Sequence, residues 1–365
     1  MPRRDGQELG RRARHRHRHA APPRRRRRPV TGGPCLLTGA TGFIGGHVAQ
    51  RLVRDGRHVR CLVRPTSDAA LLRELGVELA VGDLMDAASV ARAAQGCDAV
   101  VHGAALVSDW ATVAEIRQVN VQGTRNVLDA AAGASVRRLV HISSTDVYGH
   151  PGGRAVDETH VATRFANWYA ETKALAEREV RATAQARGLE AVILRPATVY
   201  GPRSTDVIGE IAKAIRGRHM VLIDGGRTIA GLVYAGNVAD AALLALDHEA
   251  APGEAYNITD ALPVTWRGLT DDLAAGLGCP PVRLSMPYDV AGAIGTGLEH
   301  GYRLLRRATG LRTAPLLSRQ AVQVMGVDQD FSNARAREGL GWTPRVGYAA
   351  GLEATLDWLR ALPGG

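Results

Sequence analysis

A glycine-rich turn between an apolar strand and a helix is the feature of this sequence that most restricts its fold. The segment PCLLTG, residues 34–39, predicts a short buried strand, and FIGGHVAQRLVRDG, residues 43–56, predicts a helix. Between them, TGATGFIGG spaces Gly39, Gly42 and Gly45 three residues apart. Gly39 permits a tight turn, Gly42 lets the backbone approach a pyrophosphate, and Gly45 allows close packing of the helix on the strand. In this order the glycines predict a dinucleotide site at the N-terminus of the helix.

The same alternation continues along the chain and sets the fold class. Strands regularly followed by helices predict an α/β fold, a Rossmann-type doubly wound parallel sheet with a smaller C-terminal substrate-binding part. The strands are predicted within residues 58–64, 77–84, 98–105, 137–144 and 190–202, and the helices within 68–75, 86–96, 112–132 and 169–188.

Beyond residue 205 the alternation becomes less regular. Helices are predicted near 206–216, 236–247 and 265–276, with apolar helical stretches over 285–325. We therefore expect the Rossmann domain to span residues 34–204, with 231–260 contributing to its core. Residues 205–365 are expected to form mainly a substrate-binding or lid region.

The positive charge of the chain is confined to its N-terminus. Residues 1–30 hold twelve arginines against Asp5 and Glu8, which accounts for the whole formal net charge of +10. The rest of the chain therefore has no net charge, and its composition does not indicate a basic surface for binding a nucleic acid. We expect residues 1–33 to form a disordered, solvated Arg/His-rich tail. The alternatives are an arm for nucleic acid or a membrane surface, or a crude His-based metal site.

Cysteine usage and hydropathy favour a cytoplasmic protein. The four cysteines show neither paired nor metal-ligand spacing, and we predict no metal site. No apolar stretch is long enough for a transmembrane helix, and no signal-peptide apolar region follows the basic stretch. The segment YRLLRRATGLR, residues 302–312, leaves peripheral membrane contact open. A lid or surface helix over the pocket is the favoured interpretation of that segment.

The end of the second predicted strand bears on the choice of nucleotide. NAD sites usually carry an acid there, which binds the ribose 2′-hydroxyl. Here CLVRPTSD places Arg64 at that point, with Ser67 just beyond. A guanidinium can pair with a 2′-phosphate, so NADP(H) is favoured over NAD(H). Asp83, in VGDL, is placed to bind the adenine amino group; its alternative is a helix N-cap, a role that Asp86 can fill instead.

Tyr169 and Lys173 form the predicted catalytic pair. They lie four residues apart on a predicted helix and so project from one face. A phenol is a poor acid–base catalyst at neutral pH unless a neighbouring cation stabilises its phenolate. Lys173 is one of only two lysines in this arginine-rich chain, and a compact ammonium suits that task better than a planar guanidinium. Ser144, at the end of the fifth strand, supplies a hydroxyl beside the reacting oxygen.

These motifs together resemble the extended short-chain dehydrogenase/reductase family. The resemblance covers about residues 34–360 and is carried by TGATGFIG, VGDL, HGAA, HISS, YAETK and RPATVYGP. It implies a sheet of about seven strands, Tyr169 as acid/base, Lys173 as its activator and Ser144 as donor to the substrate oxygen. Asn120 matches the helix asparagine of the family, for which a structural role is at least as well supported as a catalytic one. The residues that the resemblance places against the cofactor are Gly39, Thr41, Gly42, Phe43, Ile44, Gly45, Arg64, Asp83, Leu84, Ala104, Ala105, Tyr169, Lys173, Pro196 and Ala197.

Within the family, the main alternative is a nucleotide-sugar epimerase or dehydratase. Those enzymes carry an Asn before the V-Y-G-P-like turn and an Arg that grips the diphosphate. This chain has Thr198 at the first place and Ala230 at the second, with Arg227 three residues earlier. The usual Asp of the second segment is replaced by Gly236, next to Asn237. Losing the Arg removes a charge-assisted contact worth about 1.5–3 kcal/mol.

Apart from that alternative, the sequence resembles the 3β-hydroxysteroid dehydrogenase-like branch of the family. That resemblance implies hydride transfer between NADP(H), or NAD(H), and a secondary alcohol or ketone of a bulky apolar steroid-, polyketide- or 3-keto-acid-like molecule. It also suggests a homodimer in which the helix carrying Tyr169 pairs with its symmetry mate. A second alternative, a non-catalytic NADP(H)-binding sensor, is disfavoured because a sensor needs no activated phenol.

Overall fold

The structure is a computed structural model, and it describes residues 32–107, 111–165, 167–309 and 318–362. Most of the expected N-terminal tail, residues 1–31, lies outside the described residues. So does the end of the basic stretch predicted over residues 302–312.

Seven strands form one central sheet in the order β10-β6-β5-β4-β1-β2-β3, and all neighbours in it are parallel. This confirms the predicted doubly wound sheet. The strand order reverses between β1 and β4, which is where open α/β sheets bind their ligands. The strands are β1 (Cys35–Thr38), β2 (Val59–Val63), β3 (Glu78–Val81), β4 (Ala99–His102), β5 (Arg138–Ile142), β6 (Glu190–Pro196) and β10 (Ala255–Ile258).

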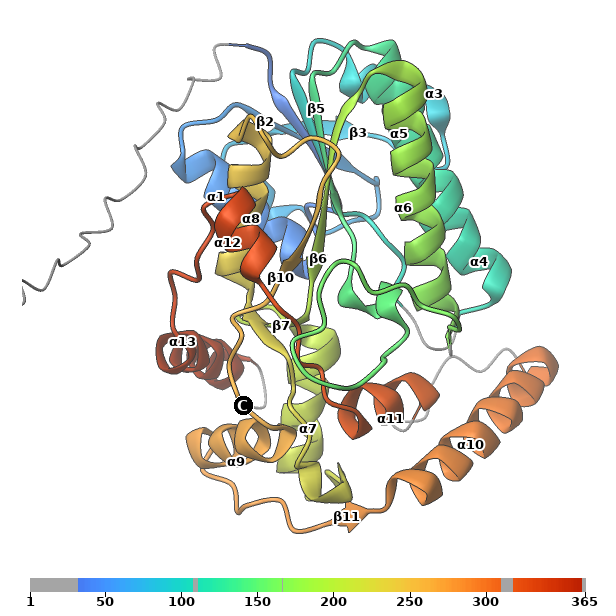
Figure 1. The fold of residues 1–365 in the computed structure, drawn as a ribbon, viewed down its shortest axis with the longest axis vertical. Helices are drawn as coiled ribbons and strands as arrows, with labels where there is room; N and C mark the ends of the chain where they lie inside the picture. Colours follow the sequence, from blue (N-terminus) through green and yellow to red (C-terminus); the bar gives the residue numbers. More distant parts are fainter. Residues whose placement is uncertain (1–31, 108–110, 166, 310–317, 363–365) are drawn as a thin grey trace, which may run out of the picture.

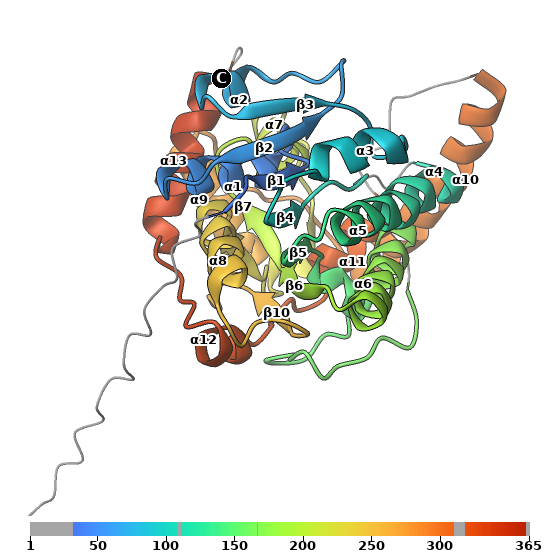
Figure 2. The ribbon, with the colours of Figure 1, turned by 90° about the horizontal axis from the view of Figure 1, so that it is seen from above.

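Helices cover both faces of the sheet, as the view from above shows (Figure 2). Successive strand residues point to opposite faces, so Leu36 packs in one buried layer and Leu37 in the other. Both layers are buried and apolar. The strands are therefore apolar at successive positions in the sequence and do not alternate between apolar and polar residues. One face carries α1 (Phe43–Arg54), α2 (Ala70–Glu74), α8 (Ala235–Asp247) and α12 (Ala334–Gly339); the other carries α3 (Ala87–Ala94), α4 (Val113–Arg117), α5 (Gly123–Gly133) and α6 (Trp168–Arg187).

A smaller part with its own apolar core lies beyond the carboxyl ends of the strands (Figure 1). Its largest buried side chain is Trp266, which packs with residues of three helices. Among the described residues no helix is both long and apolar enough to cross a membrane. The elements of this part are β7 (Thr198–Tyr200), η3 (Thr205–Gly209), α7 (Glu210–Arg216), β8 (Leu222–Ile223), η4 (Asp224–Gly226), β9 (Leu232–Tyr234), α9 (Trp266–Gly276), β11 (Ser285–Met286), α10 (Tyr288–Thr309), α11 (Arg319–Gly326) and α13 (Tyr348–Ala361).

The helix predicted over residues 112–132 is interrupted. A π-helical turn, η1 (Gln118–Gln122), joins α4 to α5. The widened turn carries Asn120, whose amide accepts a hydrogen bond from Leu106 N (2.7 Å) and donates one to Leu106 O (3.1 Å). It donates another to Thr172 Oγ1 at 3.1 Å. Asn120 thus ties the loop after β4 to the helix that carries Tyr169, a structural role.

Asn237 joins the two parts at the first turn of α8. Its side chain is fully buried and donates to Asp260 Oδ1 and to Val346 O, both at 2.9 Å. It accepts from the backbone N–H groups of Arg345 and Val346, both at 3.0 Å. The buried amide therefore has four partners from two distant segments, and its loss would leave each of them unpaired.

We predict that Asn237→Ala lowers the free energy of unfolding by about 2–4 kcal/mol, because one carboxylate and three backbone groups lose their hydrogen bonds to a buried amide. Urea denaturation followed by circular dichroism measures the effect. Gln95→Ala, which removes an exposed side chain at the end of α3, is the control and should change stability by less than about 0.5 kcal/mol. Equal stabilities for the two variants would contradict the role given to Asn237.

Candidate functional site

A cavity of about 700 Å³ opens at the carboxyl ends of the sheet strands, facing the smaller part. Its wall comes from the ends of six strands and from α11, so residues far apart in sequence meet there. Every site residue predicted from the sequence lies on this one wall. They are Gly39, Thr41, Gly42, Phe43, Ile44, Gly45, Arg64, Asp83, Leu84, Ala104, Ala105, Ser144, Tyr169, Lys173, Pro196 and Ala197.

The glycine turn has the shape that a dinucleotide requires. Gly39 has φ +76°, and a Cβ there would lie 2.6 Å from Ala104 N. A Cβ on Gly45 would overlap the carbonyl of Gly39. Gly42 is the N-cap of α1, and no side chain caps that end of the helix. The N–H groups of the first turn are therefore available to a phosphate, and the residues present fit a dinucleotide.

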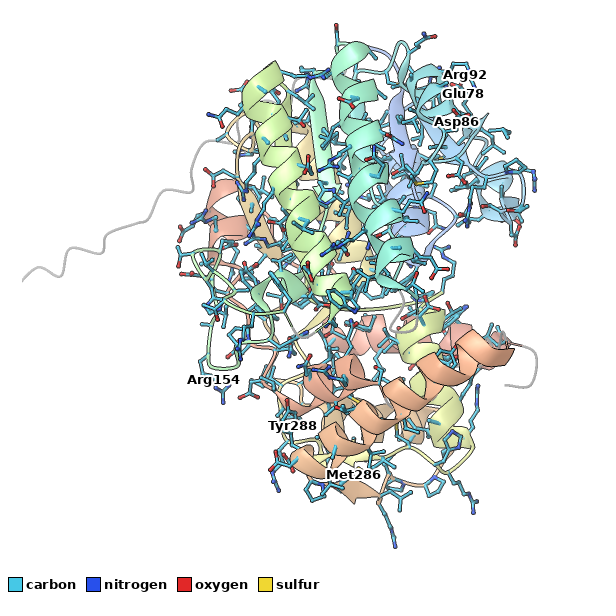
Figure 3. The ribbon with its side chains drawn as sticks, turned by 90° about the vertical axis from the view of Figure 1, so that its right-hand side faces the viewer. Glu78, Asp86, Arg92, Arg154, Met286 and Tyr288 are labelled. Carbon is cyan, nitrogen blue, oxygen red and sulfur yellow. The ribbon has the colours of Figure 1, made fainter. Side chains whose placement is uncertain are left out.

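Two charged residues mark the nucleotide end of the cavity. Arg64 follows β2 and is exposed, and among the described residues no acidic side chain pairs with it. Asp83 follows β3, and its Oδ1 accepts a hydrogen bond from Met85 N at 2.8 Å. Asp86, not Asp83, caps α3, where its carboxylate accepts from Ala88 N and lies near Arg92 (Figure 3). Asp83 thus lies at the cavity wall, and its contact with the adenine amino group stays a prediction.

Lys173 lies inside the protein and holds its ammonium beneath the cavity. It is 3% exposed, and Nζ donates a hydrogen bond to Ile142 O at 2.7 Å. Burial lowers the pKa of Lys173 to about 8, while the charges of Glu177 and Asp146 act in the opposite direction. Near neutral pH the side chain is therefore still mostly charged.

Tyr169 and Ser144 both line the cavity wall. Burial raises the pKa of Tyr169 above its ordinary value, and the charge of Asp146 raises it further. The hydroxyl of Ser144 acts in the opposite direction and lowers this pKa. Ser144 Oγ also accepts from Asp146 N at 3.1 Å, which fixes its position. The phenol is thus protonated in the free protein and placed to donate a proton into the cavity.

Two buried imidazoles lie beside the lysine. His102 is bonded to Thr38 Oγ1 (2.7 Å) and Thr124 Oγ1 (3.0 Å), and its ring lies 5.3 Å from that of His141. Burial lowers the pKa of His102 to about 3 and that of His141 well below its ordinary value; the charge of Lys173 adds to both shifts. Both imidazole rings are therefore neutral. Of these three neighbouring side chains, only Lys173 carries a positive charge.

Three further residues of the wall were not assigned a role from the sequence. Asp146 lines the cavity, and its charge raises the pKa values of both Tyr169 and Lys173. Gln320, on α11, donates from Nε2 to Asp146 Oδ2 at 3.3 Å, and Gln329 lies farther along the same wall. The position of Asp146 two residues after Ser144 was a usable signal. Nothing in the spacing pointed to the two glutamines, because they come from the distant C-terminal segment.

Comparisons with known proteins agree with this geometry. The family model "NAD dependent epimerase/dehydratase family" matches residues 35–259. A "4-hydroxy-2-methyl-3-oxo-4-farnesyl-3,4-dihydroquinoline-1-oxide ketoreductase" of Stigmatella aurantiaca is 34% identical over 87% of this chain and 94% of its own. A "2-alkyl-3-oxoalkanoate reductase" of Stenotrophomonas maltophilia is 33% identical, with coverages of 87% and 96%. A "3-beta-hydroxysteroid dehydrogenase" of Mycolicibacterium neoaurum is 31% identical, with coverages of 86% and 87%.

Solved structures share the fold. A dTDP-glucose 4,6-dehydratase from Streptomyces venezuelae, with NAD bound, superimposes with a TM-score of 0.72 at 26% identity. The match covers 90% of this chain and 98% of that structure.

We predict that Lys173 loses its proton near pH 8, below the ordinary lysine value of about 10.4. With two lysines in the chain, the labelled Cε groups give two NMR signals, and exposed Lys213 supplies the internal reference. Asp146→Asn should move the Lys173 midpoint to lower pH, because Asp146 favours the charged form.

The unfolded chain keeps the proton of Lys173 to higher pH than the folded protein does. The contribution of Lys173 to the free energy of unfolding therefore increases as pH rises from about 8 to about 10.4. A Lys173 midpoint at the ordinary value would contradict its burial.

Proposed function

The chain belongs to the NAD dependent epimerase/dehydratase family, and we propose that it transfers hydride between a nicotinamide cofactor and a ketone or secondary alcohol of a bulky apolar substrate. One observation carries the proposal: Ser144, Tyr169 and Lys173 meet in the cavity that also holds the glycine turn. The names of the relatives, two of which are reductases of oxo compounds and one a steroid dehydrogenase, support it.

The chain's own residues account for the proton half of the reaction. When bound, the nicotinamide ring supplies or accepts the hydride. In the reducing direction, Tyr169 gives its proton to the carbonyl oxygen as the carbonyl carbon gains hydride. The buried ammonium of Lys173 stabilises the phenolate that forms, and Ser144 donates a hydrogen bond to the same oxygen. The oxidising direction reverses each transfer, with the phenolate taking the proton of the alcohol.

The rest of the cavity suits an apolar molecule. Around the catalytic group the wall includes Leu106, Val107, Val199, Val207 and Val324, from both parts of the chain. Such a surface gains free energy by burying an apolar ligand, at about 25 cal/mol per Å² of apolar area. Two substrate types named by the relatives remain open. One is a ring ketone with a hydroxyl beside the oxo group; the other is an oxoalkanoate, a carboxylate at neutral pH.

A nucleotide-sugar substrate is less well supported. Ala230, at the place where such enzymes carry the diphosphate-binding Arg, is fully buried in the core of the smaller part. Arg227 is exposed and does not line the cavity. Without a cation at this place, the described residues offer no charge-assisted contact to a diphosphate.

The cofactor we propose is NADP(H). Arg64 stands at the end of β2, exposed at the cavity wall and without an acidic partner among the described residues. An unpaired guanidinium there attracts a 2′-phosphate, whereas the acid typical of NAD sites would repel it.

We also propose that the protein is a homodimer. A hollow on the outer surface of α4, η1, α5 and α6 is lined by half-buried Leu175 and by Val121, which is largely buried, and is framed by Arg117, Arg125 and Glu171. A mixed apolar and charged face on the helix that carries Tyr169 is suited to packing against its symmetry mate.

Tyr169→Phe tests the proposed chemistry. We expect turnover of a ketone with NADPH to fall roughly 10²- to 10⁴-fold, because no other group supplies the proton. Cofactor affinity, measured by nicotinamide fluorescence, should change little. The matched control is Tyr288→Phe, at the start of α10 and outside the cavity (Figure 3). Full activity of the Tyr169 variant would refute the assignment, and turnover of a nucleotide sugar but of no ketone would favour the alternative.

Arg64→Ala tests the choice of cofactor. We expect the KM for NADPH to rise at least about tenfold, the loss of one charge-assisted contact, with little change in the KM for NADH. Arg73→Ala, on the exposed side of α2 and outside the cavity, is the control. A wild-type enzyme that prefers NADH would contradict the proposal.

A further inference from the structure

Asp146 is a charged residue of the cavity wall, and its charge acts on the catalytic tyrosine. It lies two residues after Ser144, its backbone N–H donates to the Ser144 hydroxyl, and all three residues, Ser144, Asp146 and Tyr169, line the cavity. The negative charge of Asp146 acts on both Tyr169 and Lys173. The carboxylate therefore stands beside the place where the substrate oxygen must lie.

The protein only partly satisfies this carboxylate. Gln320 Nε2 donates to Oδ2 at 3.3 Å, near the limit for a hydrogen bond. His150 Nε2 lies 3.8 Å from Oδ1, beyond hydrogen-bond distance. The side chain of His150 is 3% exposed and does not line the cavity, so it leaves the cavity side of Asp146 uncovered. The remaining acceptor capacity of Asp146 is thus directed to solvent or to a ligand.

No cation among the described wall residues offsets this charge on the substrate side. Five of them carry charge: Arg64, Asp83, Asp146, Lys173 and Asp206. Arg64 and Asp83 lie at the nucleotide end, and Lys173 is buried below the cavity, bonded to Ile142 O. Asp206 is exposed and adds a second negative charge.

Filling such a cavity changes the surroundings of Asp146. A bulky apolar ligand displaces the water that solvates the carboxylate, and an unpaired buried charge is strongly unfavourable. A ligand that carries a hydroxyl or N–H group beside its carbonyl replaces the lost hydrogen bonds. A ligand that carries a carboxylate at the same place is repelled instead.

We propose that Asp146 selects the substrate: a neutral ketone with a hydrogen-bond donor next to the reacting carbonyl, such as an α-hydroxy ketone, and not a free 3-oxo acid. The proposal rests on the oxidoreductase function above and narrows its substrate class. It assigns Asp146 a contact with the substrate's own polar group, separate from the proton transfer by Tyr169.

The test compares matched pairs of substrates with the full-length protein and NADPH. A long-chain β-keto methyl ester is compared with its free acid, and a long-chain acyloin with the ketone that lacks its hydroxyl. For the wild type we expect kcat/KM to favour the ester over the acid by roughly 10- to 100-fold, the effect of a like charge a few ångströms away. We expect the acyloin to exceed the plain ketone by about tenfold, the gain from one charge-assisted hydrogen bond.

Three variants assign these preferences to the side chain. Asp146→Asn removes the charge and should reduce the ester-to-acid ratio to within about threefold of unity. Asp146→Glu keeps the charge and should retain a preference for the ester. Asp129→Asn removes a carboxylate bonded to Arg187 outside the cavity and should leave the ratio unchanged. Thermal unfolding of each variant shows whether it is folded. If a variant does not fold, the ester-to-acid and acyloin-to-ketone ratios of the wild-type protein still test the proposal.

Binding distinguishes failure of this proposal from failure of the proposed function. Calorimetric titration of ester and acid into the NADPH complex measures the same preference without turnover. If no ketone is reduced, but the ester binds more tightly and Asp146→Asn removes the difference, the proposed reaction fails and the selection stands. Ketone reduction with equal use of acid and ester, or a preference that Asp146→Asn does not alter, would overturn the selection.

Discussion

The buried ammonium of Lys173 is the interaction on which the arrangement of the site depends. A charge in the interior is stable only if other groups replace its water, and here a strand carbonyl and the carboxylates of Glu177 and Asp146 do so. Glu177 is itself held by Arg195, with bonds of 2.9 and 2.6 Å. The neighbouring imidazoles stay neutral. The ammonium of Lys173 is therefore held at the cavity wall that also carries Tyr169.

The topology of the sheet brings Tyr169 and Lys173 together with the nucleotide site. The reversal of strand order leaves a gap at the carboxyl ends of β1 and β4, bordered by the glycine turn on one side and the loop after β5 on the other. The helix that carries Tyr169 and Lys173 packs against β6 and the turn that follows β5, and Lys173 reaches Ile142 at the end of β5. The π-helical turn supports this geometry from the side, because Asn120 links the loop after β4 to Thr172, the residue before Lys173.

Local sequence patterns predicted much of the fold and of the candidate site. Features that depend on contacts between distant segments could not be predicted in this way. Gly39 is required by its positive φ, Gly45 by a backbone contact within the turn, and Tyr169 and Lys173 lie one helical period apart, so short stretches of sequence revealed them. The π-helical turn at Asn120 depends on a partner loop, and the helix pattern over residues 112–132 did not reveal it. Gln320 and Gln329 reach the wall through the packing of the C-terminal segment, which no motif encodes. The division into domains and the roles of the site residues remain predictions.

The last strand of the central sheet arrives late along the chain. β6 ends at Pro196, but its neighbour β10 begins only at Ala255, after much of the smaller part has been made. During synthesis β6 is therefore an open, apolar sheet edge, able to pair with another chain until β10 covers it. Such a non-local closing step slows folding, because the ends of a long loop must meet before their contacts stabilise the sheet. The order of strands that creates the ligand gap thus also gives the nascent protein an interval in which it is prone to aggregate.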